Sequence, residues 1–319
     1  MRIVALADIH FSGGGQDRLR RLASAAAGAR PDVLVLAGDL ATIGDENVEQ
    51  VLAEFSRLDC AKLFVAGNHD IWTEAGAGTR QRYETTLSRI AQRLGFNYLD
   101  HSPTSVGPTG FVGCLGWYDY TLRQTEEPVP GVLLSPARPL RRSSLTHLET
   151  LSERGMLRWD ELRDSDFQGK ALIWTDGRRT RTLVWNDAIY VHWQASDAEV
   201  VQEQVQRLQA AVRELDGAEH LVAVTHTVPF REAFRQPYRR VEWAFCRAYM
   251  GSSRLGAALV EEPRLRLWIC GHVHYQVVVE CQGVIVVNVS CAPEQHNAGP
   301  TLILLDGPRV RAVEQLPVS

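Results

Sequence analysis

Short aliphatic runs alternate with amphipathic helical patterns over the first hundred residues. The aliphatic runs lie at 3–7, 33–37 and 63–66. The helical patterns lie at about 16–29, 46–58 and 79–94. Runs that are apolar at every position are typical of strands buried on both faces of a sheet. Because strands and helices alternate, we expect parallel strands joined by helical crossovers.

The rest of the chain has other patterns. Residues 96–115 predict antiparallel strands around a turn rich in proline, serine and glycine. Residues 117–196 are polar and irregular, and they indicate an insertion that packs onto the core. We then expect a helix at about 197–215, a strand at 221–225, helical segments up to about 262 and a strand at 265–270. The end of the chain predicts consecutive antiparallel strands at 275–281, 284–289, 301–305 and 310–316.

The composition is that of an ordinary globular protein. Apolar residues make up 45%, and 34 basic against 38 acidic residues leave a formal charge of −4. This near-balance argues against a protein that coats nucleic acid or an anionic membrane. No apolar run approaches the ~20 residues of a membrane helix, and the N-terminus reaches Asp8 too early for a signal peptide. Scattered cysteines indicate reduced, mostly buried thiols, so we expect a cytoplasmic protein.

Polar residues with metal-binding or acid–base side chains follow five of the predicted strands. They are Asp8, His10, Asp39, Asn68, His69, Asp70, His226, His272 and His274. The carboxyl ends of strands are where open α/β sheets build their sites. In an extended chain residues i and i+2 point the same way, so each Asp-x-His or His-x-His pair can converge on one point. Glycines before Asp39, Asn68 and His272 would let the backbone turn sharply beneath the site.

Each of these features alone has an ordinary structural interpretation. A Gly-Asp pair is usually a turn, and a histidine after a strand, such as His226, is usually a hydrogen-bonded core residue. Five such features, all at strand ends of one chain, favour a common site instead.

In chain order, Asp-x-His, Gly-Asp, Gly-Asn-His-Asp, a later strand-end histidine and Gly-His-x-His resemble the motifs of the calcineurin-like metallophosphoesterase superfamily. The resemblance extends from residue 8 to residue 274. It implies a single metallophosphoesterase domain over residues 1–319, with the insertion at about 117–196. The implied fold is α/β, a four-layer α/β/β/α sandwich of two mixed sheets flanked by helices.

Carried over by position, the resemblance also implies two divalent metal ions, of which Mn²⁺, Fe²⁺ or Zn²⁺ suit the donor set. One ion would be held by Asp8, His10, Asp39 and His274. The other would be held by Asp39, which bridges, and by Asn68, His226 and His272. His69 would contact the phosphate or protonate the leaving group. Asp70 would orient His69 by accepting its other ring proton.

The charge of this donor set fits an anionic substrate. Two carboxylates, four neutral histidines and one amide leave a pair of divalent ions with a net charge of about +2. We therefore expect an enzyme that hydrolyses a small phosphate ester with metal-activated hydroxide, with a slight preference for a small or cyclic-nucleotide phosphodiester. A phosphomonoesterase of a small metabolite and a non-catalytic metal-binding interaction module on the same fold stay open. Neither a membrane nor nucleic acid is an expected partner.

The insertion is expected to form a lid that sets substrate choice. Its residues Trp117, Tyr118 and Tyr120 either stack on a substrate or form a packed aromatic core. Arginines in and after the insertion either contact an anion or lie on a solvated face: Arg141, Arg142, Arg178, Arg179, Arg181, Arg231 and Arg235.

Overall fold

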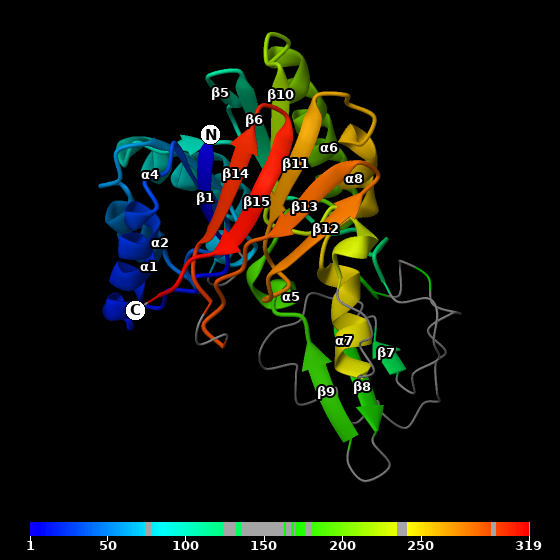
Figure 1. The fold of residues 1–319 in the computed structure, drawn as a ribbon. Coiled ribbons are helices and arrows are strands. Elements are labelled where there is room, and N and C mark those ends of the chain that lie inside the picture. The colour runs from blue at the N-terminus through cyan, green and yellow to red at the C-terminus, as the bar shows by residue number, and fades with distance from the viewer. Residues whose placement is uncertain are drawn as a thin grey trace.

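Two six-stranded sheets pack face to face at the centre of the protein (Figure 1). The computed structural model describes residues 1–73, 78–123, 132–134, 163, 167–168, 170–175, 180–234, 241–294 and 298–318. The first sheet has the order β15 (Arg309–Gln315), β14 (Thr301–Asp306), β1 (Arg2–Leu6), β2 (Val33–Ala37), β3 (Ala61–Val65) and β4 (Asn97–Tyr98). From β1 to β4 its strands are parallel, whereas β14 and β15 are antiparallel to their neighbours.

The second sheet is mixed as well. Its order is β12 (Val277–Cys281), β13 (Val284–Asn288), β11 (Leu265–Cys270), β10 (His220–Thr225), β6 (Thr109–Cys114) and β5 (Thr104–Val106). The four inner strands are parallel, and the two edge strands are antiparallel to their neighbours. The predicted sandwich of two mixed sheets is therefore confirmed.

Helices cover the outer face of each sheet (Figure 1). The first sheet is covered by α1 (Gln16–Gly28), α2 (Asp45–Phe55) and α4 (Leu87–Arg93). The second is covered by α6 (Asp197–Glu214) and α8 (Ser253–Leu259). Shorter elements are η1 (His69–Ile71), α3 (Thr79–Gln81), η3 (Arg82–Thr86), α5 (Asp187–Tyr190), η8 (Arg231–Ala233), α7 (Val241–Cys246) and η9 (Arg247–Tyr249). The helix α6 begins with a capping box in which Ser196 and Glu199 exchange hydrogen bonds.

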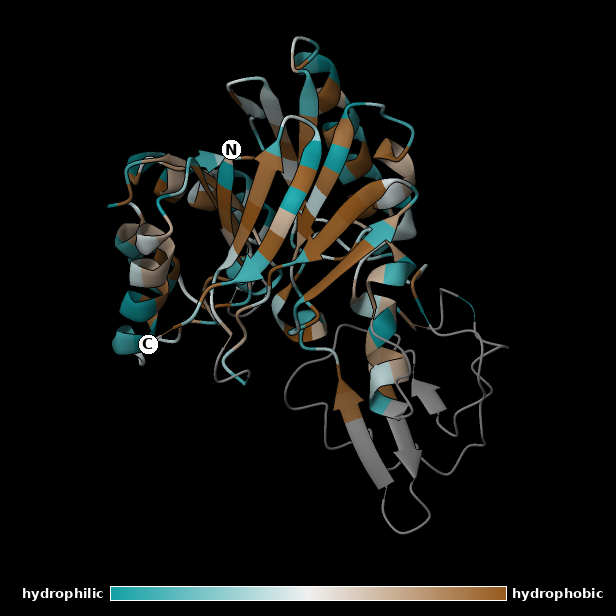
Figure 2. Cartoon of the chain, in the orientation of Figure 1, coloured by the Kyte–Doolittle hydropathy of each residue, from teal (hydrophilic) through white to brown (hydrophobic). Residues whose placement is uncertain are grey.

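The hydrophobic core between the sheets explains why the predicted strands are apolar at every position. Inward side chains from both sheets meet there, among them Ile3, Val35, Leu63, Phe111, Val224, Ile269, Val287 and Ile303. The alternate residues of the same strands pack under the helices. Figure 2 shows hydrophobic residues along β11, β13 and β14, whereas α1 has both hydrophobic and hydrophilic residues. Burial on both faces is what positions the strand ends rigidly.

Two predicted strand pairings are wrong in part. Residues 96–115 do not form one antiparallel unit, because β4 is parallel to β3 in the first sheet and β6 is parallel to β10 in the second. The last four strands form two separate hairpins, one in each sheet. The chain crosses between the sheets after β13, where Ala7 exchanges backbone hydrogen bonds with Val289 and Cys291. Because the strands of both sheets are equally hydrophobic, the sequence does not indicate where the chain crosses from one sheet to the other.

The predicted helix at 79–94 is interrupted. It consists of α3, the π-helical turn η3 and α4. Within η3 the consecutive side chains of Arg82 and Tyr83 are both buried. Arg82 donates to the backbone oxygen of Asp70, and Tyr83 donates to Asp100 at 2.6 Å. The irregular turn therefore ties this helix to the loops at the strand ends.

The segment expected to be an insertion forms a third sheet of β7 (Val132–Leu134), β8 (Ala171–Thr175) and β9 (Thr180–Val184). In Figure 1 this sheet lies beyond the two central sheets, next to α7. Trp117, Tyr118 and Tyr120 are buried, so they form a packed aromatic core. Arg231 donates to the carbonyls of Thr121 and Arg123. The side chain of Arg181 and the other candidate arginines lie outside the described residues.

Among the helices of the described residues, none is long and apolar enough to cross a membrane. All six cysteines are free thiols. Cys114, Cys270, Cys281 and Cys291 are buried, and the other two are half-buried, as the scattered spacing predicts.

We expect Glu84→Gln to lower the free energy of unfolding by about 1–2 kcal/mol at pH 7. Glu84 in η3 accepts hydrogen bonds from His101 at 2.9 Å and from Arg207 of α6 at 3.2 Å. Burial alone would raise the pKa of Glu84, but these hydrogen bonds lower it to about 2 from an ordinary value of 4.5. Because the folded-state pKa is depressed, the stabilisation is present above pH 4.5 and is lost as the pH falls towards 2.

Urea denaturation of wild type and variant at pH 7 and at about pH 3 measures this difference. The matched control is Asp306→Asn, because Asp306 pairs with Arg311 at an exposed position and should change stability little. A difference for Glu84→Gln that stays the same at both pH values would contradict the prediction.

Candidate metal centre

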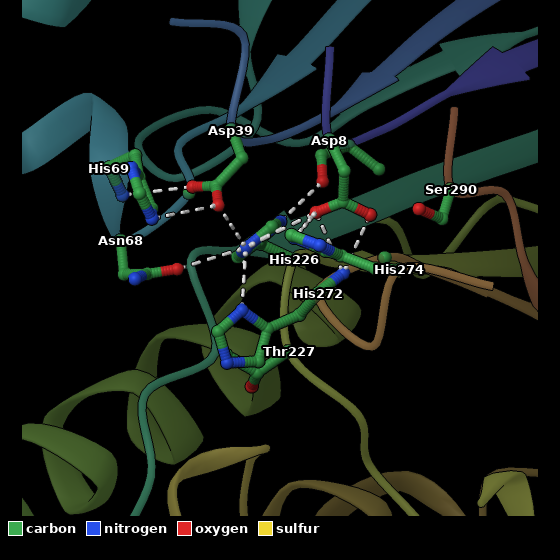
Figure 3. A network of polar contacts seen from close by, with 12 residues as sticks. Asp8, Asp39, Asn68, His69, His226, Thr227, His272, His274 and Ser290 are labelled. Carbon is green, nitrogen blue, oxygen red and sulfur yellow. Dashed lines mark hydrogen bonds and ion pairs between the residues drawn. The ribbon is translucent and has the colours of Figure 1, made fainter. Parts of the chain in front are cut away.

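The loops after β1, β2, β3, β10 and β11 meet at one edge of the sandwich (Figure 3). Ligand atoms of Asp8, His10, Asp39 and His274 all lie within 4.8 Å of one another. Those of Asp39, His226 and His272 form a second such group. Asn68 adjoins it, with its Oδ1 3.1 Å from His226 Nε2. The structure thus brings all seven predicted ligands together, and Asp39 belongs to both groups.

The backbone at this edge is unusual. The same seven residues include five with a positive φ, between 48° and 71°: Asp8, His10, Asp39, His272 and His274. A left-handed backbone at a residue other than glycine costs on the order of 1–3 kcal/mol and persists only where its surroundings hold it. Here it turns the side chains that follow each strand towards a common centre (Figure 3).

The motif glycines serve mainly to allow close approach. A Cβ at Gly67 would lie 2.2 Å from the backbone nitrogen and from Oδ1 of Asp39. Gly38 has a φ of +83°, and a Cβ there would lie 2.7 Å from His226 Nδ1. The predicted sharp turn is therefore present at Gly38, whereas Gly67 is needed because two loops are in contact.

Outer hydrogen bonds fix the ring orientation of three histidines. His226 Nδ1 donates to the Ala37 carbonyl at 2.9 Å, and His272 Nε2 donates to the Tyr249 carbonyl at 3.1 Å. His274 Nδ1 contacts the carboxylate of Glu294. With one nitrogen engaged outside, the other nitrogen of each ring faces the centre. Glu294 was not among the sequence candidates, because it lies in no motif.

The inner atoms crowd around one unpaired oxygen. Asp39 Oδ2 is buried and has no hydrogen-bond partner in the described part of the chain. It lies 3.3 Å from His226 Nε2 and 3.6 Å from His10 Nε2. The inner nitrogens of His10 and His274 are 3.0 Å apart, and those of His226 and His272 are 3.1 Å apart. Nitrogen and oxygen ligand atoms that converge in this way suit cations, so these residues fit a pair of divalent metal ions.

Burial and mutual charge shift the pKa values of these groups. Burial lowers the pKa of His10 to about 4 and holds the pKa of His272 well below its ordinary value. Burial would raise the pKa of Asp39, but the imidazoles around it, His226 foremost, hold it well below the ordinary value. Burial opposes charge on His226, yet the carboxylate of Asp39 raises its pKa to about 9.

The expected contact between Asp70 and the ring of His69 is wrong. Asp70 Oδ1 accepts from the backbone amides of Leu40 and Ala41, and Oδ2 accepts from that of Gly67 at 2.8 Å. Asp70 thus joins the loop after β2 to the loop after β3, and burial raises its pKa to about 7. His69 Nδ1 instead lies 3.3 Å from the Thr42 carbonyl. Its backbone amide donates to Asp39 Oδ1 at 2.9 Å.

A cleft of about 290 Å³ opens onto these residues. Its polar lining includes Asp39, Asn68, His69, His272 and His274. The rest of the lining is mostly apolar and includes Trp72, Leu183, Val184, Trp185, Trp243, Cys246, Met250 and Val273. Asp187 also lines the cleft and was missed by the sequence analysis, because a buried acid in an irregular segment leaves no pattern.

This arrangement is that of a candidate metal centre with two groups of ligands, and it agrees with the family to which the chain is matched. The chain belongs to the calcineurin-like phosphoesterase family, whose model matches residues 1–276. No curated protein matches it significantly.

Two solved structures have a similar fold. One is the phosphopantetheinyl hydrolase from Mycobacterium tuberculosis, with 18% identity and a TM-score of 0.59, covering 91% of this chain and 89% of that one. Another is a dimetal phosphatase from Danio rerio, with 15% identity and a TM-score of 0.55, covering 100% of this chain and 99% of that one. At these identities the likeness concerns the fold alone.

Proposed function

We propose that this chain is a two-metal phosphoesterase that prefers small phosphodiesters. One ion is held by Asp8, His10, Asp39 and His274, and the other by Asp39, Asn68, His226 and His272. The observation that carries the proposal is the buried oxygen of Asp39, which has no hydrogen-bond partner among the described residues and lies between two groups of inward imidazole nitrogens. A donor set of nitrogen and oxygen without sulfur suits Mn²⁺, Fe²⁺ or Zn²⁺.

Asp39 and His69 have different roles at this centre. When bound, the ion pair supplies positive charge to the phosphoryl oxygens and activates water for attack on phosphorus. Asp39 holds the two halves of the centre together, because both groups of ligands share it. His69 has a side chain 21% exposed, and its Nε2 lies 4.0 Å from Asp39 Oδ2. This exposure and this distance support a role for His69 in contacting the phosphate or in giving a proton to the departing oxygen.

The lining of the cleft supports a diester as substrate. Among the described residues that line it there is no lysine and no arginine. A dianionic monoester gains more than a monoanionic diester from cationic side chains beyond the metals. The apolar lining residues, among them Trp185 and Trp243, suit a leaving group that has apolar or aromatic surface, such as a nucleoside base.

Hydrolysis of two chromogenic esters tests the proposal. We expect Mn²⁺-loaded protein to hydrolyse bis-p-nitrophenyl phosphate with a kcat/KM about tenfold or more above that for p-nitrophenyl phosphate. Chelator-treated protein is the control and should be inactive until Mn²⁺ is restored. Turnover of a panel of cyclic and linear nucleotide esters then identifies the class of substrate. Faster monoester hydrolysis would identify a phosphomonoesterase, and bound metal without any hydrolysis would identify a non-catalytic module.

A further inference from the structure

Asp187 is a buried acid that connects the segment after β9 to the metal centre. Its side chain is 0% exposed and stands at the first residue of α5. Four donors surround the carboxylate. They are Asn68 Nδ2 at 3.0 Å, Trp72 Nε1 at 2.6 Å, Tyr118 Oη at 3.2 Å and Trp185 Nε1 at 2.7 Å. Two carboxylate oxygens offer about four lone-pair positions, so these four donors use them all.

This contact determines which way the Asn68 carboxamide points. Asp187 Oδ1 already accepts the indole N–H of Trp72, and it therefore takes the NH₂ group of Asn68 rather than its carbonyl. The carbonyl oxygen is left on the opposite side. There it lies 3.1 Å from His226 Nε2, among the inward ligand atoms (Figure 3). A reversed carboxamide would present NH₂, which cannot bind a cation.

The same carboxylate also supports His69. The ring of Trp72 stacks on the imidazole of His69 with centroids 3.6 Å apart. Because Asp187 holds the indole N–H of Trp72, it restricts the surface on which His69 rests. His69 is further held by Thr42 through its Nδ1.

We propose that Asp187 is a positioning residue of the metal centre, which presents the Asn68 carbonyl oxygen to one metal ion and holds Trp72 against His69. This inference rests on the proposed function, since it assumes the metal ion at Asn68. It makes the chain between β9 and α6 a structural part of the centre as well as a wall of the cleft.

Metal affinity measured by titration calorimetry with Mn²⁺ alone tests the inference. Asp187→Asn keeps the size of the side chain but places an NH₂ group against donors. We expect affinity for one of the two ions to fall about 10- to 100-fold, with the other changed by less than about threefold. The matched control is Tyr118→Phe, which removes one donor to Asp187 and leaves Asn68 in place. It should retain both affinities within about threefold.

Two results with these two variants would overturn the inference. One is wild-type affinity for both ions in Asp187→Asn. The other is an equal loss in Asp187→Asn and Tyr118→Phe, because that would indicate general loosening of the buried cluster.

A second variant leaves residue 187 unchanged, in case Asp187→Asn does not fold. Asn68→Asp adds a charged ligand, which by itself would bind Mn²⁺ more tightly. If Asp187 faces residue 68 as the 3.0 Å contact shows, two carboxylates repel each other in metal-free Asn68→Asp, so its free energy of unfolding in urea is lower than that of metal-free wild type and Mn²⁺ restores it. Metal-free Asn68→Asp that is as stable as metal-free wild type would overturn the inference.

Because metal affinity is measured separately from hydrolysis, failure of this inference can be distinguished from failure of the proposed function. A protein that binds two Mn²⁺ ions, loses one on Asp187→Asn and hydrolyses no phosphate ester supports the inference and contradicts the proposed activity. A wild-type protein that binds no Mn²⁺ contradicts the proposed metal centre, and the inference falls with it.

Discussion

Asp39→Asn is expected to reduce Mn²⁺ stoichiometry from two to one or none and to lower kcat/KM for bis-p-nitrophenyl phosphate by about 10³-fold or more. The substitution keeps the shape of the side chain, and its carbonyl oxygen can still accept the His69 amide, which donates to Asp39 Oδ1 at 2.9 Å. It removes the negative charge that both groups of ligands share. Metal analysis and steady-state kinetics on the same preparation measure both effects.

The control for this variant is the same substitution at an exposed aspartate that belongs to neither group of ligands. Asp17 in α1 has a side chain 84% exposed, and Asp17→Asn should bind two ions and keep full activity. Two bound ions and unchanged turnover in Asp39→Asn would rule out a bridging role for Asp39.

Asp70→Ala is expected to destabilise the fold by about 3 kcal/mol and to weaken metal binding as well. Three backbone amides, of Leu40, Ala41 and Gly67, lose their acceptor in this variant. Each unpaired buried donor costs about 1–3 kcal/mol, part of which is offset by removing a buried acid. The loops that carry Asp39 and Asn68 lose these three hydrogen bonds, so their side chains are held less firmly in the common orientation. Urea denaturation and calorimetry with Mn²⁺ measure the two losses.

His69→Ala distinguishes this role from the one expected from the sequence. If Asp70 acted by orienting His69, both variants would lose turnover and keep their metals and stability. The contacts of Asp70 predict a different result, in which His69→Ala keeps both ions and only Asp70→Ala loses stability. Equal stability of Asp70→Ala and wild type would refute the linking role.

The central fold and the inward residues could be predicted because both depend on local patterns. Strands buried on both faces are apolar at every position, and the residues that follow them are read directly from the chain. Sheet membership could not be predicted in this way. The run at 284–289 and the run at 301–305 are equally apolar, yet β13 and β14 belong to different sheets. The change of sheet between β13 and β14 is visible only in the structure, where Ser290, which follows β13, forms a bridge with Ala7 of the first sheet.

The residues that support the metal ligands could not be predicted from the sequence, for a related reason. Glu294 and Asp187 act through another side chain, and neither stands at a strand end or in a repeated spacing. Asp70 is in a motif, but its partners are backbone amides on a distant loop. Spacing along the chain indicates which side chains share a direction, and it does not indicate which backbone groups they will reach.

The left-handed residues at the strand ends belong to both sheets, Asp8 and Asp39 to the first and His272 and His274 to the second. Cations bound among them would cross-link the two halves of the sandwich. The free energy of metal binding then adds to the cohesion between the sheets, since only the folded chain assembles the ligands. Supply of metal would therefore govern the lifetime of the protein against proteolysis as well as its turnover, and chelation would shorten both together.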